Sequence, residues 1–393
     1  MSERDPRPSC DPGHPWGWAP MPPLRSAPPY LMADAIDREP AMAERLAVDA
    51  SRSGARAIAA LLREGAATGW PTAVVGCGTS EHASIGATAI WREGWRAAGL
   101  PGMGAVARQA FEAAREPWPG PVVGISHEGG SRATIDAMGA ARALGGRAGL
   151  LTAGANSPAA AAADAILCTG ELDLSWCHTI AYVMPLVASA VVADVLAGRV
   201  TDPAAVRAPL EHGLRAADAA RELARQLASV RTLVVAASGA DRAAGRELCL
   251  KIEEAAYVPA AYRDLETMLH GHIPSLDVGT GLVLVLADAH DLEARAARAR
   301  QLLSAVARVG VRAGALVTAS ASVALPSALT PAGRVVVPDP EGLSTPAAAL
   351  LATAVPLQLT TYHLALALGT NPDALRREFA PYRAAADAAE GAG

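Results

Sequence analysis

The sequence predicts an α/β protein built from two tandem, doubly wound parallel sheets with helices on both faces. Short apolar strands alternate along the chain with helical segments, which is the pattern of parallel strands joined by crossover helices. The same order of elements begins twice, first at Ala73 and again at Thr232, which indicates an internal duplication. Apolar residues make up 51% of the chain but aromatic residues only 4%, a composition that suits helices packed on parallel strands better than a β-sandwich.

The first half opens with helices and continues as a series of strands and helices. The periodicity of 32–50 predicts a helix that Pro40 interrupts, and 51–63 predicts a second helix. The other expected elements of this half are strands over 73–75, 122–125, 148–152 and 165–168, and helices from about 81, over 131–144 and from about 179.

A helical connector over 207–227 leads into the second half, which repeats the pattern. Its expected strands are 232–236, 282–286, 313–317 and 334–337, with helices over 241–256 and 346–368. We therefore divide the chain into a disordered Pro-rich leader (1–28), N-terminal helices (29–60), a first sheet domain (61–205), a helical connector (206–230), a second sheet domain (231–370) and a polar C-terminal tail (371–393).

Composition argues against several classes of function. The net charge of −5 and the lack of a basic stripe disfavour nucleic acid as a partner. The five cysteines lie far apart without a CxxC pair, so we expect reduced thiols and neither disulfides nor a zinc site. The leader lacks the apolar core of a signal peptide, and the apolar stretch 180–197 carries Asp194, so we expect a buried helix there and not a membrane span. We expect a cytoplasmic protein that uses no metal or other cofactor and binds no membrane.

Two loops at predicted strand ends are the candidates for ligand binding, because ligands of open parallel sheets bind beyond the carboxyl ends of the strands. Both loops combine glycines with hydroxyl groups ahead of a helix, which favours an anion or polyol site. Neither has the spacing of a P-loop or of a dinucleotide fingerprint. The alternative is that they are ordinary strand-to-helix turns, with His127 a surface residue. The candidate residues are Cys77, Gly78, Thr79, Ser80, Ser126, His127, Glu128, Gly129 and Ser131.

Five segments, in order along the chain, carry a resemblance to one family. They are MADAIDREPAMAERL, VVGCGTSEHA, ISHEGGSRATIDAMGAARALG, ELCLKIEEAAYVPAAY with LHG soon after it, and VPLQLTTYHLALALGTNPDALR. From about Leu31 to Arg383 the chain resembles proteins with tandem SIS (sugar isomerase) domains, such as the isomerase half of glucosamine-6-phosphate synthase (glutamine–fructose-6-phosphate aminotransferase), without the glutaminase domain. The resemblance implies two SIS domains that bind a sugar phosphate or amino sugar between the subunits of a homodimer.

The resemblance also implies roles for individual residues. Glu254 corresponds to the carboxylate that moves a proton between C1 and C2 of the sugar, and His270 to the histidine that opens the sugar ring across the subunit interface. Ser175 and Lys251 fall in segments that contact the substrate. Without the resemblance, Glu254 is equally well explained as an acidic residue on an exposed helix face beside Lys251. His270 and His272 together suggest a metal, but no further ligands cluster near them in the sequence, so we expect none.

Three positions depart from the pattern of the family. The C-terminal catalytic lysine of the family falls near Ala380, and Lys251 is the only lysine in the chain, so a Schiff base could form only at Lys251. Glu128 stands where the phosphate-binding loop has a second serine. His178 stands where the family usually has a lysine.

The leading hypothesis is an isomerase, or a deaminase-like or deglycase-like enzyme, that acts on a sugar phosphate or amino sugar. Glu254 is then the base and His270 the ring-opening acid–base residue. A non-catalytic sugar-phosphate-binding regulator or sensor is the alternative, although nothing in 1–30 predicts a DNA-binding helix-turn-helix. A structural dimer with decayed sites is a third hypothesis, against which the retained CGTS, EE and HG segments argue.

Overall fold

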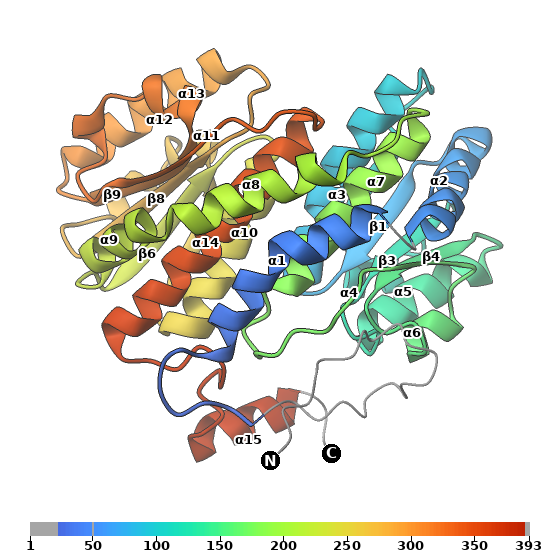
Figure 1. Cartoon of the computed structure of the whole chain (residues 1–393), viewed down its shortest axis with the longest axis horizontal. Coiled ribbons are helices and arrows are strands. Elements are labelled where there is room, and N and C mark those ends of the chain that lie inside the picture. Colours follow the sequence, from blue (N-terminus) through green and yellow to red (C-terminus); the bar gives the residue numbers. More distant parts are fainter. Residues whose placement is uncertain (1–22, 49–50, 390–393) are drawn as a thin grey trace.

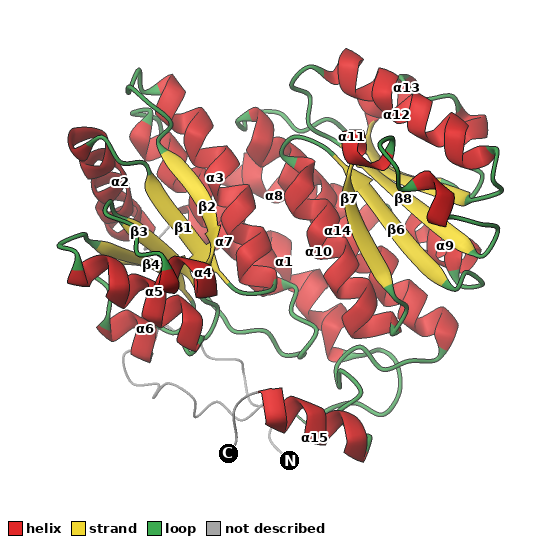
Figure 2. Ribbon diagram, turned by 180° about the vertical axis from the view of Figure 1, so that it is seen from behind, coloured by secondary structure: helices red, strands yellow, loops and turns green. Residues whose placement is uncertain are grey.

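The computed structural model describes residues 23–48 and 51–389, in which two parallel sheets lie side by side (Figures 1 and 2). The strands of the first sheet are β1 (Thr72–Gly76), β2 (Ala105–Gln109), β3 (Val122–Ile125), β4 (Ala148–Thr152) and β5 (Ala165–Cys168). Their order is β2-β1-β3-β4-β5, and all neighbouring pairs are parallel. β3, β4 and β5 begin and end at the predicted residues.

The second sheet repeats this arrangement. Its strands are β6 (Thr232–Ala237), β7 (Ala260–Asp264), β8 (Thr280–Leu286), β9 (Arg312–Thr318) and β10 (Arg334–Val337). Their order is β10-β9-β8-β6-β7, again parallel throughout, so the second strand of each half lies outside the first. The predicted fold class, two doubly wound parallel sheets in tandem, is confirmed.

Helices bury both faces of the sheets. Along β1, Val74 joins one apolar cluster, while Ala73 and Val75 join another. The helices of the first half are α1 (Leu31–Val48), α2 (Ser51–Thr68), α3 (Thr79–Ala97), α4 (Ala110–Arg115), α5 (Arg132–Ala143), α6 (Pro158–Ala161) and α7 (Ile180–Leu196). Those of the second half are α8 (Pro203–Arg215), α9 (Ala217–Leu227), α10 (Asp241–Lys251) with a π-helical turn after it (Ile252–Ala256), α11 (Leu265–Met268), α12 (Leu292–Ala307), α13 (Ala319–Val323), α14 (Thr345–Leu368) and α15 (Ala380–Ala389).

Two strands were missed by the sequence prediction, and both are edge strands. β2 and β7 occupy equivalent positions outside β1 and β6, and most of their side chains are only partly buried. Each ends in polar residues, Arg108-Gln109 and Arg263-Asp264, because an edge strand is not enclosed on both sides. The apolar run that marks the central strands is therefore absent from them.

Several predicted helix boundaries are wrong. Helix α1 continues through Pro40, which is buried where the helix packs against α7 and α8, so packing outweighs the hydrogen bond that proline cannot donate. The connector is two helices, which meet at Ala216. Helix α15 forms within the polar tail. Of the predicted leader, residues 1–22 lie outside the described residues.

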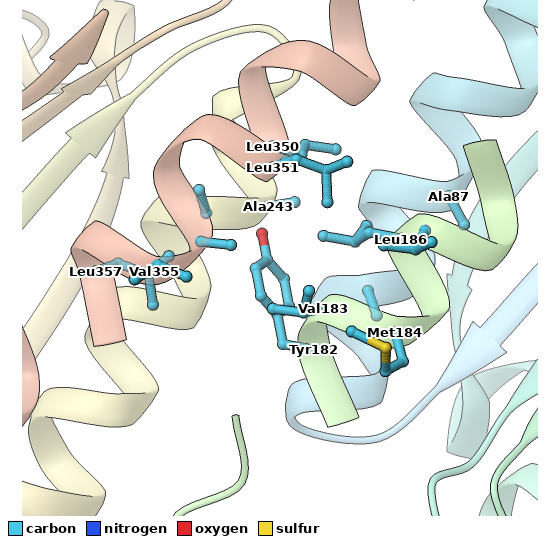
Figure 3. Close-up of a cluster of buried hydrophobic side chains, with 14 of the residues drawn as sticks. Ala87, Tyr182, Val183, Met184, Leu186, Ala243, Leu350, Leu351, Val355 and Leu357 are labelled. Atoms are coloured by element: carbon cyan, nitrogen blue, oxygen red, sulfur yellow. The ribbon is translucent and has the colours of Figure 1, made fainter. Parts of the chain in front are cut away.

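The largest apolar cluster lies between the two sheets and contains residues of both halves. Helix α7 packs there against α14, with Tyr182, Leu186, Leu350 and Leu351 among the buried side chains (Figure 3). Nearly the whole of α7 is buried, which confirms the expectation for 180–197. Helix α3 contacts α7, α14 and α10, so this shared core holds α3 and α10 beside each other. These two helices carry the candidate site.

Candidate functional site

The loops after β1 and β3 lie at the point where the strand order of the first sheet reverses. We call residues 76–80 and 126–131 the first-sheet edge. The chain leaves β1 towards β2 on one side and β3 towards β4 on the other, and ligands of open α/β sheets bind at such a point because the two loops diverge there. Thr79 and Ser80 open α3, and Ser131 precedes α5, where Ser126 Oγ donates to Ser131 Oγ at 3.4 Å.

Glycine is required at three positions of the first-sheet edge. A Cβ on Gly76 would lie 2.5 Å from the carbonyl of Ser80, and Gly78 has a positive φ of 55°. Gly129 combines a φ of 75° with a Cβ position only 1.8 Å from Ser157 Oγ. The glycines therefore allow tight turns that bring the first turns of α3 and α5 to the sheet edge.

The end of α10 contributes the charged part of the site. Lys251 Nζ lies 2.5 Å from Glu254 Oε2 and 3.6 Å from Glu247 Oε1. The side chains of Lys251 and Glu247 are each 1% exposed, whereas that of Glu254 is 23% exposed. Glu254 is therefore the carboxylate of this group that a ligand can reach.

Glu247 connects α10 to the first-sheet edge. Thr79 Oγ1 donates to Glu247 Oε1 at 3.2 Å, and His82 Nδ1 lies 2.7 Å from Glu247 Oε2. We call Thr79, His82, Glu247, Lys251 and Glu254 the α3–α10 network. Sequence reasoning missed Glu247 and His82, although both lie inside the segments that carry the resemblance, and Glu247 is one helical turn before Lys251.

The α3–α10 network shifts the pKa values of its two carboxylates in opposite directions. Burial alone would lower the pKa of Lys251, but Glu254 and Glu247 outweigh burial, and its pKa is raised. Burial raises the pKa of Glu254 more than Lys251 lowers it, whereas for Glu247 the charges of Lys251 and His82 prevail and the pKa is lowered. Lys251 is therefore an ammonium and not the neutral amine that a Schiff base requires.

A buried aspartate organises the loop after β5. The carboxylate of Asp173 accepts N–H bonds from Thr179, Ile180 and Ala181 at 2.8 to 3.1 Å, so it caps α7. The Asp173 N–H donates to His127 Nε2 at 2.8 Å. This hydrogen bond occupies Nε2 of His127 and joins the loop after β5 to the loop after β3.

Cys177 of the same loop adjoins the network, and Ser175 and Trp176 precede it. Ser175 is buried, and its Oγ accepts the N–H of Cys177 at 3.2 Å. The Cys177 thiol lies within hydrogen-bonding reach of Glu254, and burial raises its pKa, so it remains a thiol. The Arg377 guanidinium lies 3.7 Å from the ring centroid of Trp176, so the C-terminal segment packs over the loop.

Other predicted site residues lie at the margin or elsewhere. Cys77 is partly buried, with Sγ 3.9 Å from Thr134 Oγ1, and burial raises its pKa. Glu128 is exposed. His270 is 69% exposed and lies 2.8 Å from Glu266, which also pairs with Arg298 of α12. A single subunit therefore does not bring His270 to the α3–α10 network.

The equivalent edge of the second sheet is closed by its own side chains. Arg295 Nη1 donates to Ser238 Oγ at 2.9 Å and lies beside Asp288, which accepts the Ala240 N–H at 2.9 Å. Helix α10 starts at this edge and runs back past the sheet for about 16 Å before it reaches Lys251. The first-sheet edge therefore lies beside the C-terminal half of α10, where Thr79 bonds to Glu247.

Cys77, Cys177 and Cys249 are free thiols, as expected. Cys10 lies outside the described residues. Within residues 23–48 and 51–389, no group of three His, Cys, Asp or Glu side chains is arranged to hold a metal ion. One helix of this part of the chain, α14, is long and apolar enough to cross a membrane, but 89% of its apolar window is buried in the fold, as in the core helix of a globular domain.

Comparisons with known proteins define the class of fold. No family model and no curated protein matches the chain. Solved structures do match over most of its length, and they show that the fold is that of tandem SIS domains, as the sequence resemblance implied.

Three of these structures illustrate the likeness. The C-terminal domain of glucosamine-fructose-6-phosphate aminotransferase from Francisella tularensis has a TM-score of 0.73 and 18% identity, over 87% of this chain and 97% of that one. Tagatose-6-phosphate ketose/aldose isomerase from Escherichia coli has a TM-score of 0.68 and 18% identity, over 90% of this chain and 97% of that one. Glucosamine-6-phosphate deaminase from Thermotoga maritima has a TM-score of 0.65 and 16% identity, over 88% of this chain and 97% of that one.

Proposed function

We propose that this protein binds a phosphorylated sugar or amino sugar at the first-sheet edge and acts as an isomerase or deaminase-like enzyme, with Glu254 as the base. The α3–α10 network is the observation that carries the proposal. It joins the hydroxyl-bearing loop after β1 to a buried ammonium and a partly exposed carboxylate. An anionic substrate bound at this loop would therefore lie near a base.

The chemistry follows from these groups. The hydroxyls of Ser80 and Ser131, together with the first turns of α3 and α5, suit a phosphate group. Glu254 takes a proton from the carbon next to the carbonyl and returns it to the neighbouring carbon, which converts an aldose to a ketose or the reverse. The Lys251 ammonium stabilises the negative charge that develops on the sugar oxygens during the transfer.

The solved structures support the class of substrate. The Escherichia coli protein is a tagatose-6-phosphate ketose/aldose isomerase, and the Thermotoga maritima protein is a glucosamine-6-phosphate deaminase. The names of both include a hexose 6-phosphate. We propose the same class of ligand for this chain.

The test is a panel of aldose, ketose and amino-sugar 6-phosphates, with exchange of the C2 proton in D2O followed by NMR and ammonia release measured in parallel. Glu254→Gln retains shape but removes the base, so turnover is expected to fall about 10²–10⁴-fold while substrate binding persists. Glu253→Gln is the matched control, because Glu253 is the adjacent carboxylate, is exposed and accepts the Ala260 N–H. Equal turnover in wild type and Glu254→Gln would rule out Glu254 as the base.

A non-catalytic sugar-phosphate sensor is the second candidate, and one observation favours it. Glu254 is already paired with Lys251 at 2.5 Å, and the chain has no other lysine. Calorimetric binding of a sugar phosphate without proton exchange, ketose formation or ammonia release would identify a sensor.

The homodimer and the cytoplasmic location also remain proposals. The dimer is expected to bury well over about 1,000 Å². Sedimentation at micromolar concentration measures the oligomeric state, and a fully active monomer would remove any role for His270 in a partner's site.

A further inference from the structure

His178 lies where the two parts of the candidate site meet. It follows Cys177, whose thiol is within hydrogen-bonding reach of Glu254. Its ring centroid is 5.2 Å from that of His127, which belongs to the loop after β3. Lys251 and Glu247 of α10 act on it electrostatically, as does Asp173 of its own loop. The His178 side chain is also partly exposed.

We propose that His178 is the acid–base residue that opens the sugar ring, in the same subunit that supplies Glu254. The inference rests on the proposed isomerase function, for which a cyclic substrate must first open. His178 takes the proton of the anomeric hydroxyl, the electrons of that O–H bond form the carbonyl, and the bond from the anomeric carbon to the ring oxygen breaks. The ring oxygen then receives a proton from the imidazolium, which returns His178 to its starting state.

The protonation state of His178 suits this cycle. Burial, helped by the charges of His127 and Lys251, lowers its pKa to about 4, against the opposite effect of Asp173 and Glu247. At neutral pH the ring is therefore uncharged and has one nitrogen free to accept a proton. His127 cannot serve equally, because its Nε2 already accepts the Asp173 N–H.

The position of His270 strengthens the assignment. Within one subunit, His270 lies on the outer face of the second half, bonded to Glu266. His178 needs no partner subunit to reach the substrate. It also occupies a position where the sequence departs from the family it resembles, so its imidazole is a feature of this chain.

The experiment separates ring opening from proton transfer. His178→Gln and His178→Asn are assayed on a hexose 6-phosphate and on erythrose 4-phosphate, which cannot cyclise because its O4 carries the phosphate. We expect kcat/KM on the hexose to fall about 10²-fold or more, with C2-proton exchange on erythrose 4-phosphate within about threefold of wild type. His290→Gln is the control, because His290 is an exposed histidine of the second half. Thermal melting verifies that the variants fold.

A second measurement uses the wild type alone. Diethyl pyrocarbonate modification, mapped by mass spectrometry, is expected to show that a hexose 6-phosphate protects His178. The proposal is overturned if both His178 variants turn over the hexose within threefold of wild type, if His270→Gln loses hexose turnover instead, or if bound sugar leaves His178 modification unchanged. A wild type that exchanges no C2 proton on either substrate refutes the isomerase function itself, and the ring-opening role with it.

Discussion

Lys251 is the only lysine of the chain, and its side chain is buried between two carboxylates. Burial of an ammonium is unfavourable unless opposite charges compensate it, and Glu247 and Glu254 both do so. The same contacts that hold Lys251 charged tie the end of α10 to α3 through Thr79 and His82. One residue therefore serves both stability and the electrostatics of the site.

Lys251→Met is expected to destabilise the protein by about 3–5 kcal/mol, because two carboxylates would remain close together without a cation. Urea denaturation measures the loss. The double variant Lys251→Met/Glu247→Gln should recover part of it, since one of the uncompensated charges is gone. A single variant as stable as wild type would show that the pair contributes nothing to stability.

Glu39 is a second buried group whose charge state the fold controls. It is fully buried in α1, where Oε1 accepts from Gln358 Nε2 at 3.0 Å, while Oε2 has no partner among the described residues. Burial, reinforced by Asp173, raises the pKa of Glu39 well above its ordinary value of 4.5. The folded protein therefore holds a proton that the unfolded chain releases.

The sign of the pH effect follows from this difference. Below pH 4.5 both states are protonated and the fold is not penalised, but as the pH rises towards the folded-state pKa the unfolded state gains stability by ionising. Glu39→Gln removes this effect and should raise the free energy of unfolding at pH 8 by on the order of 1 kcal/mol or more, with little change at pH 4, and the melting temperature should rise accordingly. Thermal unfolding from pH 4 to 8 checks it, and an equal loss of stability at every pH would contradict it.

At the scale of elements, the contact of α3 with α7 depends on glycine. A Cβ on Gly94 would lie 2.7 Å from the Ala193 carbonyl oxygen and 2.8 Å from the Ala193 Cα. Backbone atoms cannot move aside as a flexible side chain can, so the helices would have to separate. Because α3 carries Thr79 and His82, such a shift would also disturb the α3–α10 network.

Gly94→Ala is expected to destabilise the protein by about 1–3 kcal/mol despite the better helix propensity of alanine. Gly139→Ala in α5 is the matched control, since a Cβ there has no neighbour within 4 Å, and it should stabilise by about 0.5–1 kcal/mol. Denaturant unfolding of both variants separates packing from propensity. Equal effects of the two substitutions would refute the close-packing argument.

At the scale of the whole molecule, the two halves share one core. The largest apolar cluster contains residues of α1, α3 and α7 together with residues of α10 and α14. Separate domains usually unfold independently only when the interface between them is small. Here the interface is the main core, so we expect the halves to unfold together.

The positions of the tryptophans allow a direct test. The five tryptophans of the described residues all belong to the first half, so their fluorescence reports on that half, whereas far-UV circular dichroism reports on both halves. The two transitions are expected to coincide in urea. Leu351→Ala in α14 of the second half should lower the free energy of unfolding measured by fluorescence by about 2–5 kcal/mol, because the leucine lies in the shared core. A separate second phase in circular dichroism would show that the halves are independent.

The sequence by itself determined most strands of the two sheets. β3, β4, β5 and β10 were predicted to the residue, because each contains a short apolar run, although β5 and β10 are edge strands. β2 and β7 were missed because Arg108 and Arg263 interrupt such a run. The sequence also predicted the loops after β1 and β3 and the spacing of Lys251 and Glu254. Glycines, hydroxyl groups and a spacing of one helical turn are local features.

Only the tertiary structure decided which of these groups meet. Glu247 and His82 are 165 residues apart in sequence, and the shared core of α3 and α10 makes them hydrogen-bond partners. His178 reaches the site, while the exposed His270 does not within one subunit, because of how the loop after β5 packs against α10. The orientation of the second sheet likewise depends on which helix faces pack together. Local sequence specifies strands and turns, but contacts between distant segments arise from burial of the combined apolar surface, which no single segment records.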